Sequence, residues 1–314
     1  MCTGVKLDHP TGSVLGRNMD FDYEIGYTVL YFPKGYHYLG DLSGNKDHTK
    51  YEMMGLCFNG RDPLKDGINE HGLMGITNEF SLFNTYNDQV AGGKKNISSL
   101  YFMGHILGHY RSVQEILDDI DNFHISTRDH LANKVISPPF HFFFVDAEKR
   151  SLVIEPIKGK LNAFENPYNV LTNSPSFTSH ERRLKKLIDL DNPKSFNGAK
   201  DLPGGFDPTS RFIKAYYMVD QTLPSKDYKE AMGNAYNILS ALSLPKGFIE
   251  NNKHDYYTYT FYTSVYESSQ RLLTVRSCDS PQVFSLTFDD IPNRKERLEF
   301  KIPIDFMEDR LVLK

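Results

Sequence analysis

The chain has 314 residues, of which 39% are hydrophobic and 24% are charged, an ordinary composition for a soluble globular protein. Its formal net charge is −4, whereas a nucleic-acid partner favours a basic surface, so we expect no nucleic-acid-binding function. The three cysteines, Cys2, Cys57 and Cys278, are too few for a disulfide framework. Neither a signal peptide nor an apolar run of membrane-spanning length is visible, and we expect a cytoplasmic protein that does not bind membranes.

Strand-forming residues dominate the first third of the chain. The segments 12–21 and 26–32 are rich in β-formers and are separated by a short polar stretch, which predicts two strands. Segment 67–80 predicts a hairpin that turns at residues 70–72.

A helical region follows. In segment 96–110, apolar residues recur at every third or fourth position, which is typical of a helix. Ser112 precedes Glu115 by three residues, a capping-box pattern that predicts a second helix over 113–120. Three later segments also predict helices, namely 179–190, 208–219 and 229–242.

The remaining elements are expected to be strands. They are a hairpin over 140–156, a strand over 168–174, and C-terminal strands over 256–267, 271–277 and 282–288. Strands that follow one another as hairpins form antiparallel sheets, and clustered helices favour two sheets between helical layers. The chain shows no repeat and no long linker, so we expect one α+β domain spanning residues 1–314.

Cys2 directly follows the initiator methionine, and we expect Met1 to be removed because the next residue is small. Cys2 would then carry a thiol and a free α-amine. A thiolate is a nucleophile, and an α-amine with an ordinary pKa of about 7.7–8.0 can act as a general base near neutral pH. An N-terminal nucleophile of this kind needs no histidine.

Arg17 and Asp20 are suited to the same chemistry. If residues 3–7 and 14–20 pair as a hairpin, both side chains lie beside the N-terminus. A guanidinium next to a thiol favours the thiolate, and a carboxylate can hold the amine. These residues alone leave a second interpretation open, in which Cys2 is a small buried residue and Arg17 and Asp20 form an ordinary ion pair.

Several motifs together resemble those of the choloylglycine hydrolase family, which includes bile salt hydrolases and penicillin V acylases. They are "MCT" at the start, "GRNMDF" at 16–21, "DGINEHGL" at 66–73, "LTNSP" at 171–175, "SRFIKA" at 210–215 and "YTSVYE" at 262–267. Their order and spacing resemble the family over nearly the whole chain. The resemblance implies the αββα sandwich of the N-terminal nucleophile hydrolases, and cofactor-free hydrolysis of a linear amide bond outside peptides.

The resemblance also implies roles for individual residues. Cys2 would attack the amide carbonyl as a thiolate, with its own amine moving the proton. Arg17 would lie near the thiol, and Asp20 would position the amine. Asn173 matches the asparagine whose amide stabilises the tetrahedral oxyanion, a contribution of about 2.7–4 kcal/mol for such a donor. Arg211 matches a second arginine that orients the charged network.

The family's second oxyanion donor has two candidate positions in this chain. A gapless match places it at Glu79, and a one-residue gap places it at Asn78. An ionised carboxylate cannot donate a hydrogen bond, but the backbone N–H at Glu79 can.

The family's substrate pocket is built from apolar loops around the nucleophile. The candidates here are Phe21, Ile25, Tyr27, Phe58, Phe80, Leu82, Ile136 and Phe140, although core packing is the better explanation for each of them taken alone. Bulky aromatic residues favour a flat phenoxyacetyl-type or fatty acyl group over a steroid. We therefore expect a penicillin V-like or N-acyl amino acid amide substrate. A conjugated bile salt is the alternative, and an N-acyl homoserine lactone is a further one.

The activity itself allows two more interpretations. One is a catalytically silent protein that binds acyl amides or bile acids, which the full set of matched residues argues against. The second is acyl transfer to another amine in place of water.

The assembly is predicted from segment 178–203. This segment is shorter than the corresponding excursion that helps bile salt hydrolases form tetramers. The shortening puts a tetramer in doubt, and we expect a homo-oligomer, most simply a dimer.

His105 and His109 stand four residues apart on an expected helix, which is a spacing used by metal ligands. The glutamate of the zinc-protease motif is missing, because Ile106 follows His105, and no third ligand is evident. We expect both histidines to be structural, and no metal or other cofactor.

Overall fold

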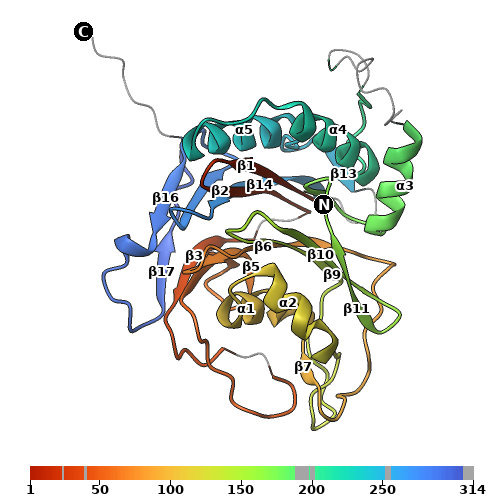
Figure 1. Cartoon of the computed structure of the whole chain (residues 1–314), viewed down its shortest axis with the longest axis vertical. Helices are drawn as coiled ribbons and strands as arrows, with labels where there is room; N and C mark the ends of the chain where they lie inside the picture. The colour runs from red at the N-terminus through yellow and green to blue at the C-terminus, as the bar shows by residue number, and fades with distance from the viewer. Residues whose placement is uncertain (23–24, 39–40, 188–197, 199–201, 252–255, 307–314) are drawn as a thin grey trace.

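Two large sheets lie face to face, with helices on both outer faces (Figure 1). The computed structural model describes the chain except for residues 23–24, 39–40, 188–197, 199–201, 252–255 and 307–314. The order of the layers is helices, sheet, sheet, helices. This confirms the predicted α+β class and the αββα sandwich.

The first sheet contains the N-terminus and, within the described residues, has seven strands. Its main path is β12-β1-β2-β14-β15-β16, and β13 pairs with β14 beside it. Neighbouring strands are antiparallel. The bounds are β1 Cys2–His9, β2 Gly12–Phe21, β12 Val170–Leu171, β13 Ile249–Asn251, β14 Tyr256–Glu267, β15 Leu272–Ser277 and β16 Phe284–Thr287.

The second sheet has eight strands in the described part of the chain, in the order β11-β10-β9-β6-β5-β4-β3-β17. Their bounds are β3 Tyr27–Phe32, β4 Met53–Phe58, β5 Leu64–Asn69, β6 Met74–Glu79, β9 Phe140–Val145, β10 Ser151–Ile157, β11 Lys160–Glu165 and β17 Leu298–Lys301. A separate parallel pair is formed by β7 Lys95–Ile97 and β8 Phe123–Ile125.

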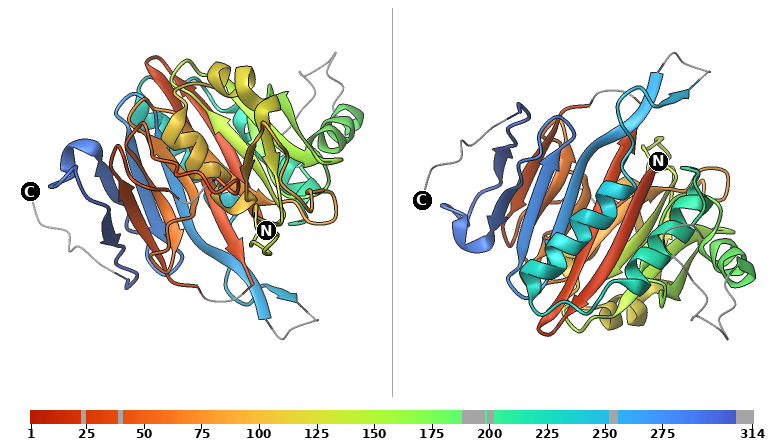
Figure 2. Two further views of the ribbon diagram at one scale, coloured as in Figure 1. Left: turned by 90° about the horizontal axis from the view of Figure 1, so that it is seen from below. Right: turned by 90° about the horizontal axis from the view of Figure 1, so that it is seen from above.

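Helices cover the outer face of each sheet. The second sheet is covered by α1 Ser99–His109 and α2 Val113–Asp119, and the first by α4 Pro208–Gln221 and α5 Tyr228–Ala241, with α3 Phe177–Leu187 beside α4 at the edge (Figures 1 and 2). Short 3-10 turns span Ile120–Asn122 and Phe288–Asp290. As predicted, Ser112 is the N-cap of α2, and its side chain accepts a hydrogen bond from the Glu115 N–H. The helices thus bury the two outer sheet faces.

The β1–β2 hairpin lies in the middle of the molecule, beneath α4 and α5 (Figure 2). Its register runs from Cys2 opposite Met19 to His9 opposite Gly12, which confirms the predicted pairing of 3–7 with 14–20. Nearly every residue of both strands is buried, because one face meets helices and the other meets the second sheet. The fold therefore holds the N-terminal residues inside the molecule.

Some elements differ from the sequence prediction. The strands β4, β11 and β17 were not predicted. In β4 the residues are apolar on both faces because all but the last are buried, so the alternating pattern of a half-exposed strand is missing. The predicted helix over 179–190 is present up to Leu187, and residues 188–190 lie outside the described part. Much of segment 178–203, on which the assembly prediction rests, also lies outside it.

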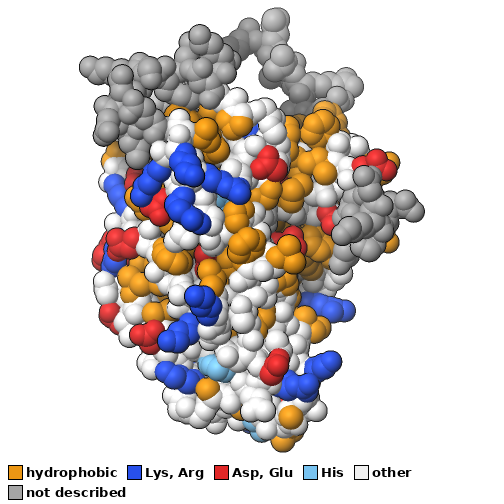
Figure 3. Space-filling view, turned by 90° about the vertical axis from the view of Figure 1, so that its right-hand side faces the viewer, with side chains coloured by type: hydrophobic (Ala, Val, Ile, Leu, Met, Phe, Trp, Pro, Cys, Tyr) orange, Lys and Arg blue, Asp and Glu red, His pale blue; other side chains and the backbone are white. Residues whose placement is uncertain are grey.

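The surface carries charges of both signs. On the face drawn in Figure 3, Lys and Arg side chains alternate with Asp and Glu side chains, and apolar side chains gather between them. In the described residues, no helix combines the length and apolarity that a membrane crossing requires.

A close backbone contact between β4 and β5 predicts the effect of one substitution. A Cβ atom at Gly55 would lie 2.1 Å from the backbone oxygen of Asp66. We expect Gly55→Ala to lower the free energy of unfolding by about 1–3 kcal/mol, because the two strands must move apart. The measurement is urea unfolding of the purified protein.

The matched control is Gly233→Ala in α5, where an added Cβ meets no atom within 4 Å. This change is expected to raise the free energy of unfolding by about 0.4–1 kcal/mol. An unchanged or higher stability of the Gly55→Ala variant would contradict the tight β4–β5 contact.

Candidate active site

Cys2 begins β1 and is 3% exposed. Its Sγ atom lies 3.3 Å from Nη2 of Arg17 and 3.7 Å from the sulfur of Met19. The Met1 amine donates a hydrogen bond to the backbone oxygen of Asp20 over 2.9 Å. The thiol is therefore in contact with the Arg17 guanidinium.

The Arg17 guanidinium is held by a buried carboxylate from the other sheet. Its Nη1 donates to Oδ2 of Asp66 over 2.7 Å, and both side chains are almost fully buried. The Tyr262 hydroxyl donates to the same oxygen over 3.0 Å, and the Tyr266 hydroxyl donates to Oδ1 of Asp66. These bonds fix the guanidinium plane, so that Nη2 faces the thiol.

The electrostatics of this cluster keep the guanidinium charged. Burial alone would lower the pKa of Arg17, but the neighbouring Cys2, Tyr262 and Asp66 raise it above its ordinary value. Burial also raises the pKa of Tyr262 well above its usual value. Tyr262 therefore keeps its proton and remains a hydrogen-bond donor to Asp66.

A second buried arginine, Arg211 on α4, holds the backbone of the first residues. Its Nη1 donates to the Cys2 carbonyl and to the Thr3 hydroxyl, each over 2.6 Å. Its Nη2 donates to Oδ1 of Asn173 over 2.9 Å, and the same oxygen accepts the Cys2 N–H over 2.6 Å. Burial lowers the pKa of Arg211, although the nearby Asp20 and Cys2 oppose the shift.

The two candidate oxyanion residues are placed differently. The side-chain NH2 group of Asn78 donates to the carbonyls of Leu171 at 3.0 Å and Thr172 at 2.9 Å. Glu79 lines the cavity beside Cys2, and its carbonyl accepts a hydrogen bond from Nδ2 of Asn173 over 3.0 Å. The structure thus brings Glu79, and not the Asn78 amide group, to the nucleophile.

Asp20 is fully buried and only partly hydrogen-bonded. Its Oδ1 accepts the Thr260 hydroxyl over 2.6 Å, whereas Oδ2 has no partner within the described residues. A register shift in β14 places Thr260 opposite Asp20. Burial raises the pKa of Asp20, and the positive charges of Arg211 and the N-terminus oppose that rise. The unpartnered oxygen is an acceptor that an amine could use.

A cavity of about 550 Å³ opens at the thiol, a volume in the range of small-molecule sites, which is about 300–1,000 Å³. Cys2, Arg17, Asp20 and Glu79 form part of its wall. The predicted pocket residues that line it are Phe21, Ile25, Phe58, Ile136 and Phe140. The cavity thus combines an apolar wall with a polar corner that contains the thiol.

Three of the predicted pocket residues do not line this cavity. Tyr27 packs on Tyr262 in the core, with ring centroids 4.9 Å apart. Phe80 is fully buried against His141. Leu82 is 97% exposed in a turn after β6. Hydrophobicity alone does not tell a core or surface position from a cavity wall.

Some residues of this site were missed by the sequence analysis. Asp66 opens the quoted "DGINEHGL" motif, so a signal for it was present. Thr260 and Tyr262 lie on the predicted aromatic strand, but the shift in its register is not visible in the sequence. Lys65, which also lines the cavity, looked like an ordinary charged residue.

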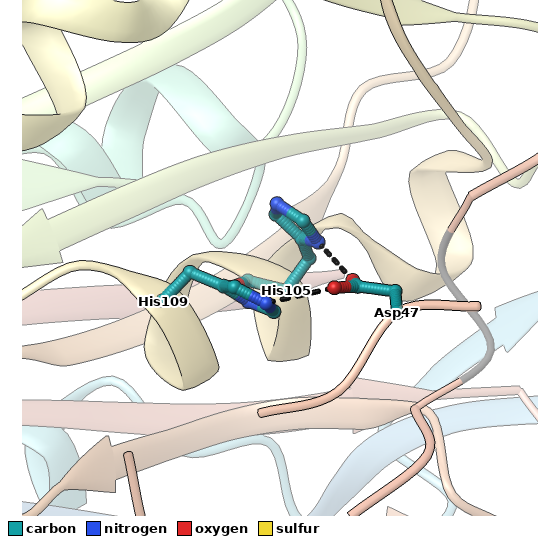
Figure 4. A group of neighbouring side chains, drawn as sticks. All are labelled: Asp47, His105 and His109. Atoms are coloured by element: carbon teal, nitrogen blue, oxygen red, sulfur yellow. Dashed lines mark hydrogen bonds and ion pairs between the residues drawn. The ribbon is translucent and has the colours of Figure 1, made fainter. Parts of the chain in front are cut away.

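A second cluster of ligand-type side chains lies away from the cavity (Figure 4). Nδ1 of His105 and Nε2 of His109 each lie 2.8 Å from a different oxygen of Asp47. The sequence showed no third ligand because Asp47 is distant in sequence and reaches the two histidines from a loop.

Comparison with known proteins identifies the family. A model of the linear amide C–N hydrolases, choloylglycine hydrolase family, matches residues 2–292. The chain belongs to this family. The bile salt hydrolase/transferase of Clostridium perfringens is 27% identical over 299 residues, covering 86% of this chain and 91% of that protein. The conjugated bile acid hydrolase of Lactobacillus acidophilus is 26% identical over 308 residues, covering 92% and 96%.

Two solved structures share the fold. A mutant conjugated bile acid hydrolase from Clostridium perfringens has a TM-score of 0.85 at 24% identity and covers 99% of this chain and 100% of its own. The penicillin V acylase from Agrobacterium tumefaciens has a TM-score of 0.77 at 20% identity and covers 93% and 87%. The family match confirms the predicted amide hydrolase, and the structural matches confirm its fold.

The buried Arg17–Asp66 pair leads to a stability prediction. We expect Asp66→Asn to lower the free energy of unfolding by about 3–5 kcal/mol, because it leaves the Arg17 charge buried without a counter-charge. Glu165→Gln is the control, since Glu165 pairs with Arg150 while its side chain is 70% exposed. Loss of that pair is expected to cost about 0–1 kcal/mol. Equal losses for the two variants in urea unfolding would contradict the account.

Proposed function

We propose that this protein hydrolyses N-acyl amides with Cys2, freed of Met1, as the nucleophile. The observation that carries the proposal is the 3.3 Å contact between Arg17 Nη2 and Cys2 Sγ at the wall of a largely apolar cavity. Family membership supports the reaction class. The contacts around Cys2 support the individual roles.

In the first half-reaction, the Cys2 sulfur attacks the amide carbonyl carbon. The thiol proton passes to the α-amine and from there to the leaving nitrogen, so that the C–N bond breaks and a thioester forms. In the second half-reaction, water adds to the thioester with the α-amine as base. The carbon–sulfur bond breaks, the proton returns to sulfur, and a carboxylic acid leaves.

Asp20 and Arg211 are proposed to position the amine end of Cys2. After Met1 is lost, the Cys2 nitrogen gains hydrogen atoms that need acceptors. Oδ1 of Asn173 already accepts the Cys2 N–H, and the unpartnered Oδ2 of Asp20 is a second acceptor in the same buried cluster. The bonds from Arg211 to the Cys2 carbonyl and Asn173 hold this geometry.

Asn173 is proposed as an oxyanion donor, together with the backbone N–H of Glu79. An amide group has two N–H bonds, and Nδ2 of Asn173 uses one on the Glu79 carbonyl. The remaining N–H can donate a hydrogen bond to the oxyanion. The side chain of Asn78 is occupied by two backbone carbonyls, so we favour Glu79 over Asn78.

For the substrate, we propose an amide with a compact aryl or aliphatic acyl group, such as penicillin V or an N-acyl amino acid. Aromatic side chains from Phe21, Phe58 and Phe140 line the cavity and suit a flat acyl group. A conjugated bile salt is the second candidate, which the bile salt hydrolases among the relatives favour.

The test compares wild-type protein with Cys2→Ala on penicillin V, glycocholate and taurocholate, by measuring release of the amine product. We expect wild-type turnover, highest for penicillin V, and a loss of at least about 10³-fold in the variant, because removing a nucleophile leaves only residual catalysis. The Cys2→Ala protein should unfold at the same urea concentration as the wild type within error, which controls for misfolding.

Two outcomes count against the proposal. Amide hydrolysis that survives in Cys2→Ala would contradict the nucleophile. A preference for the glycine or taurine conjugate would contradict the proposed acyl group and select the bile salt.

A further inference from the structure

Lys65 is the extra residue of a β-bulge at the cavity. In the β4–β5 register, Leu56 lies opposite Asp66, but the next β4 residue, Cys57, lies opposite Leu64. Lys65 therefore has no partner on β4. Bulges of this kind occur beside active sites, where they change the direction of a side chain.

The Lys65 ammonium is buried in an apolar part of the cavity. The residue is 7% exposed, and its Nζ lies 5.3 Å from the centre of the Phe58 ring and 5.0 Å from that of Phe140. Within the described residues, it has no ion pair or hydrogen bond from Nζ. Burial and the nearby Arg17 charge lower its pKa to about 8. Burying a cation without a partner costs free energy. A ligand that brings a negatively charged group to Lys65 would therefore be favoured.

No carboxylate of the protein neutralises Lys65 directly in the described structure. Asp66 is occupied by Arg17 and two tyrosine hydroxyls. Glu79, on the cavity wall, is exposed and accepts a hydrogen bond from Ser81. The cationic Arg17 and Arg61 line the same cavity, and so does Asp20, whose pKa is raised by burial. An anion that enters the apolar part of this cavity would therefore meet positive charge.

We infer that Lys65 binds an anionic group on the acyl half of the substrate. This rests on the proposed function, because the scissile carbonyl is placed at Cys2. The substrate class is an N-acyl amide whose acyl chain ends in a carboxylate, with an apolar stretch between the two groups. That stretch would contact Phe58 and Phe140 while the carboxylate pairs with the ammonium.

The test uses three chromogenic amides with equal acyl chain length. The first is hexanoyl 4-nitroanilide, the second is adipoyl 4-nitroanilide with a free ω-carboxylate, and the third is a hexanoyl amide of a carboxylated nitroaniline. We expect wild-type kcat/KM to be at least tenfold higher for the adipoyl amide than for the first. In Lys65→Met, the ratio of kcat/KM for the adipoyl amide to kcat/KM for the hexanoyl amide should fall at least tenfold, mainly because KM for the adipoyl amide rises. Lys65→Arg should restore most of this ratio.

The control variant is Lys160→Met, an exposed strand residue outside the cavity, which should leave the ratio unchanged. An equal wild-type kcat/KM for the first two amides, or a ratio unaffected by Lys65→Met, would overturn the inference. A preference for the third amide would place the anion on the amine half and would also overturn it. If none of the amides is cleaved by the wild type, the proposed function itself fails for this substrate class.

A separate observation concerns Asp47, His105 and His109 (Figure 4). Nδ1 of His109 lies 2.9 Å from the His105 carbonyl, so Nδ1 must carry the proton. In a neutral imidazole, Nε2 then has a lone pair, and Nε2 lies 2.8 Å from a carboxylate oxygen of Asp47. A proton between these two atoms fits this distance, and a tetrahedral metal ion bound to both would require them to lie about 0.5 Å farther apart.

His109 has the arrangement of a metal ligand, whereas Nε2 of His105 has no hydrogen-bond partner within the described residues. Metal-bound histidines usually donate their other ring N–H to a backbone carbonyl or a carboxylate, as His109 does here. The three potential ligand atoms lie within 4.8 Å of one another. A cavity of about 710 Å³ borders them and leaves room for water as a further ligand.

The geometry points to a divalent metal site of the zinc type at Asp47, His105 and His109. The test is titration of the purified full chain with Co²⁺ in a Cys2→Ala background, which removes the N-terminal thiol as a competing ligand. We expect d–d absorption bands that saturate near one equivalent and are displaced by Zn²⁺. His109→Gln and Asp47→Asn should abolish them, while His48→Gln, an exposed histidine of the same cavity, should not.

Near-ultraviolet circular dichroism checks that each variant is folded. A titration of the Cys2→Ala protein without saturable bands would overturn the site and leave His109 as a protonated partner of Asp47. Bands that persist in folded His109→Gln would also overturn it.

Discussion

The buried ion pair between Arg17 and Asp66 is the interaction on which the site depends. β2 belongs to one sheet and β5 to the other, so the 2.7 Å bond joins the two sheets across the sandwich. Buried charges are tolerated when they are paired and hydrogen-bonded. Two tyrosine hydroxyls complete the shell of Asp66, whereas Nε of Arg17 has no partner within the described residues. With Nη1 fixed in this way, Nη2 faces the Cys2 sulfur. The packing of the two sheets therefore sets the orientation of the guanidinium at the thiol.

Both sheets depart from regular geometry at the cavity. The register of β14 shifts at Phe261, which places Thr260 opposite Asp20. The register of β5 shifts at Lys65, whose ammonium lies among apolar rings. The regular parts of the strands bury the core, and these two irregular positions supply polar groups to the site. Cys2 itself is held by the regular pairing of β1 with β2, and it also borders the cavity.

Local sequence patterns were sufficient for much of the fold. The β1–β2 hairpin, the turn at Gly72 and the Ser112 cap each depend on residues close in sequence, and each was predicted. The layer order came from the family resemblance, because periodicity does not say which faces meet. β4 was missed because strands buried on both faces lose the alternating pattern.

The site was predictable only in part. Cys2, Arg17, Asn173 and Arg211 lie in motifs that resemble the family, and the structure brings them together. Asp66 opens the quoted 66–73 motif, but its partnership with Arg17 spans two sheets and leaves no local pattern, so its role was missed. Leu82 and Phe140 are both large and apolar, yet one is exposed and the other lines the cavity, and only the course of the backbone after each strand separates them.

The central claim is that Cys2, as the first residue of the mature chain, carries the acyl group during turnover. The most direct measurement is rapid acid quenching during amide turnover, followed by intact-mass and N-terminal peptide mass spectrometry. The account predicts a chain without Met1 that gains the mass of the acyl group, with the adduct on the peptide that begins at Cys2. An active enzyme that retains Met1, or an acyl adduct on another residue, would contradict it.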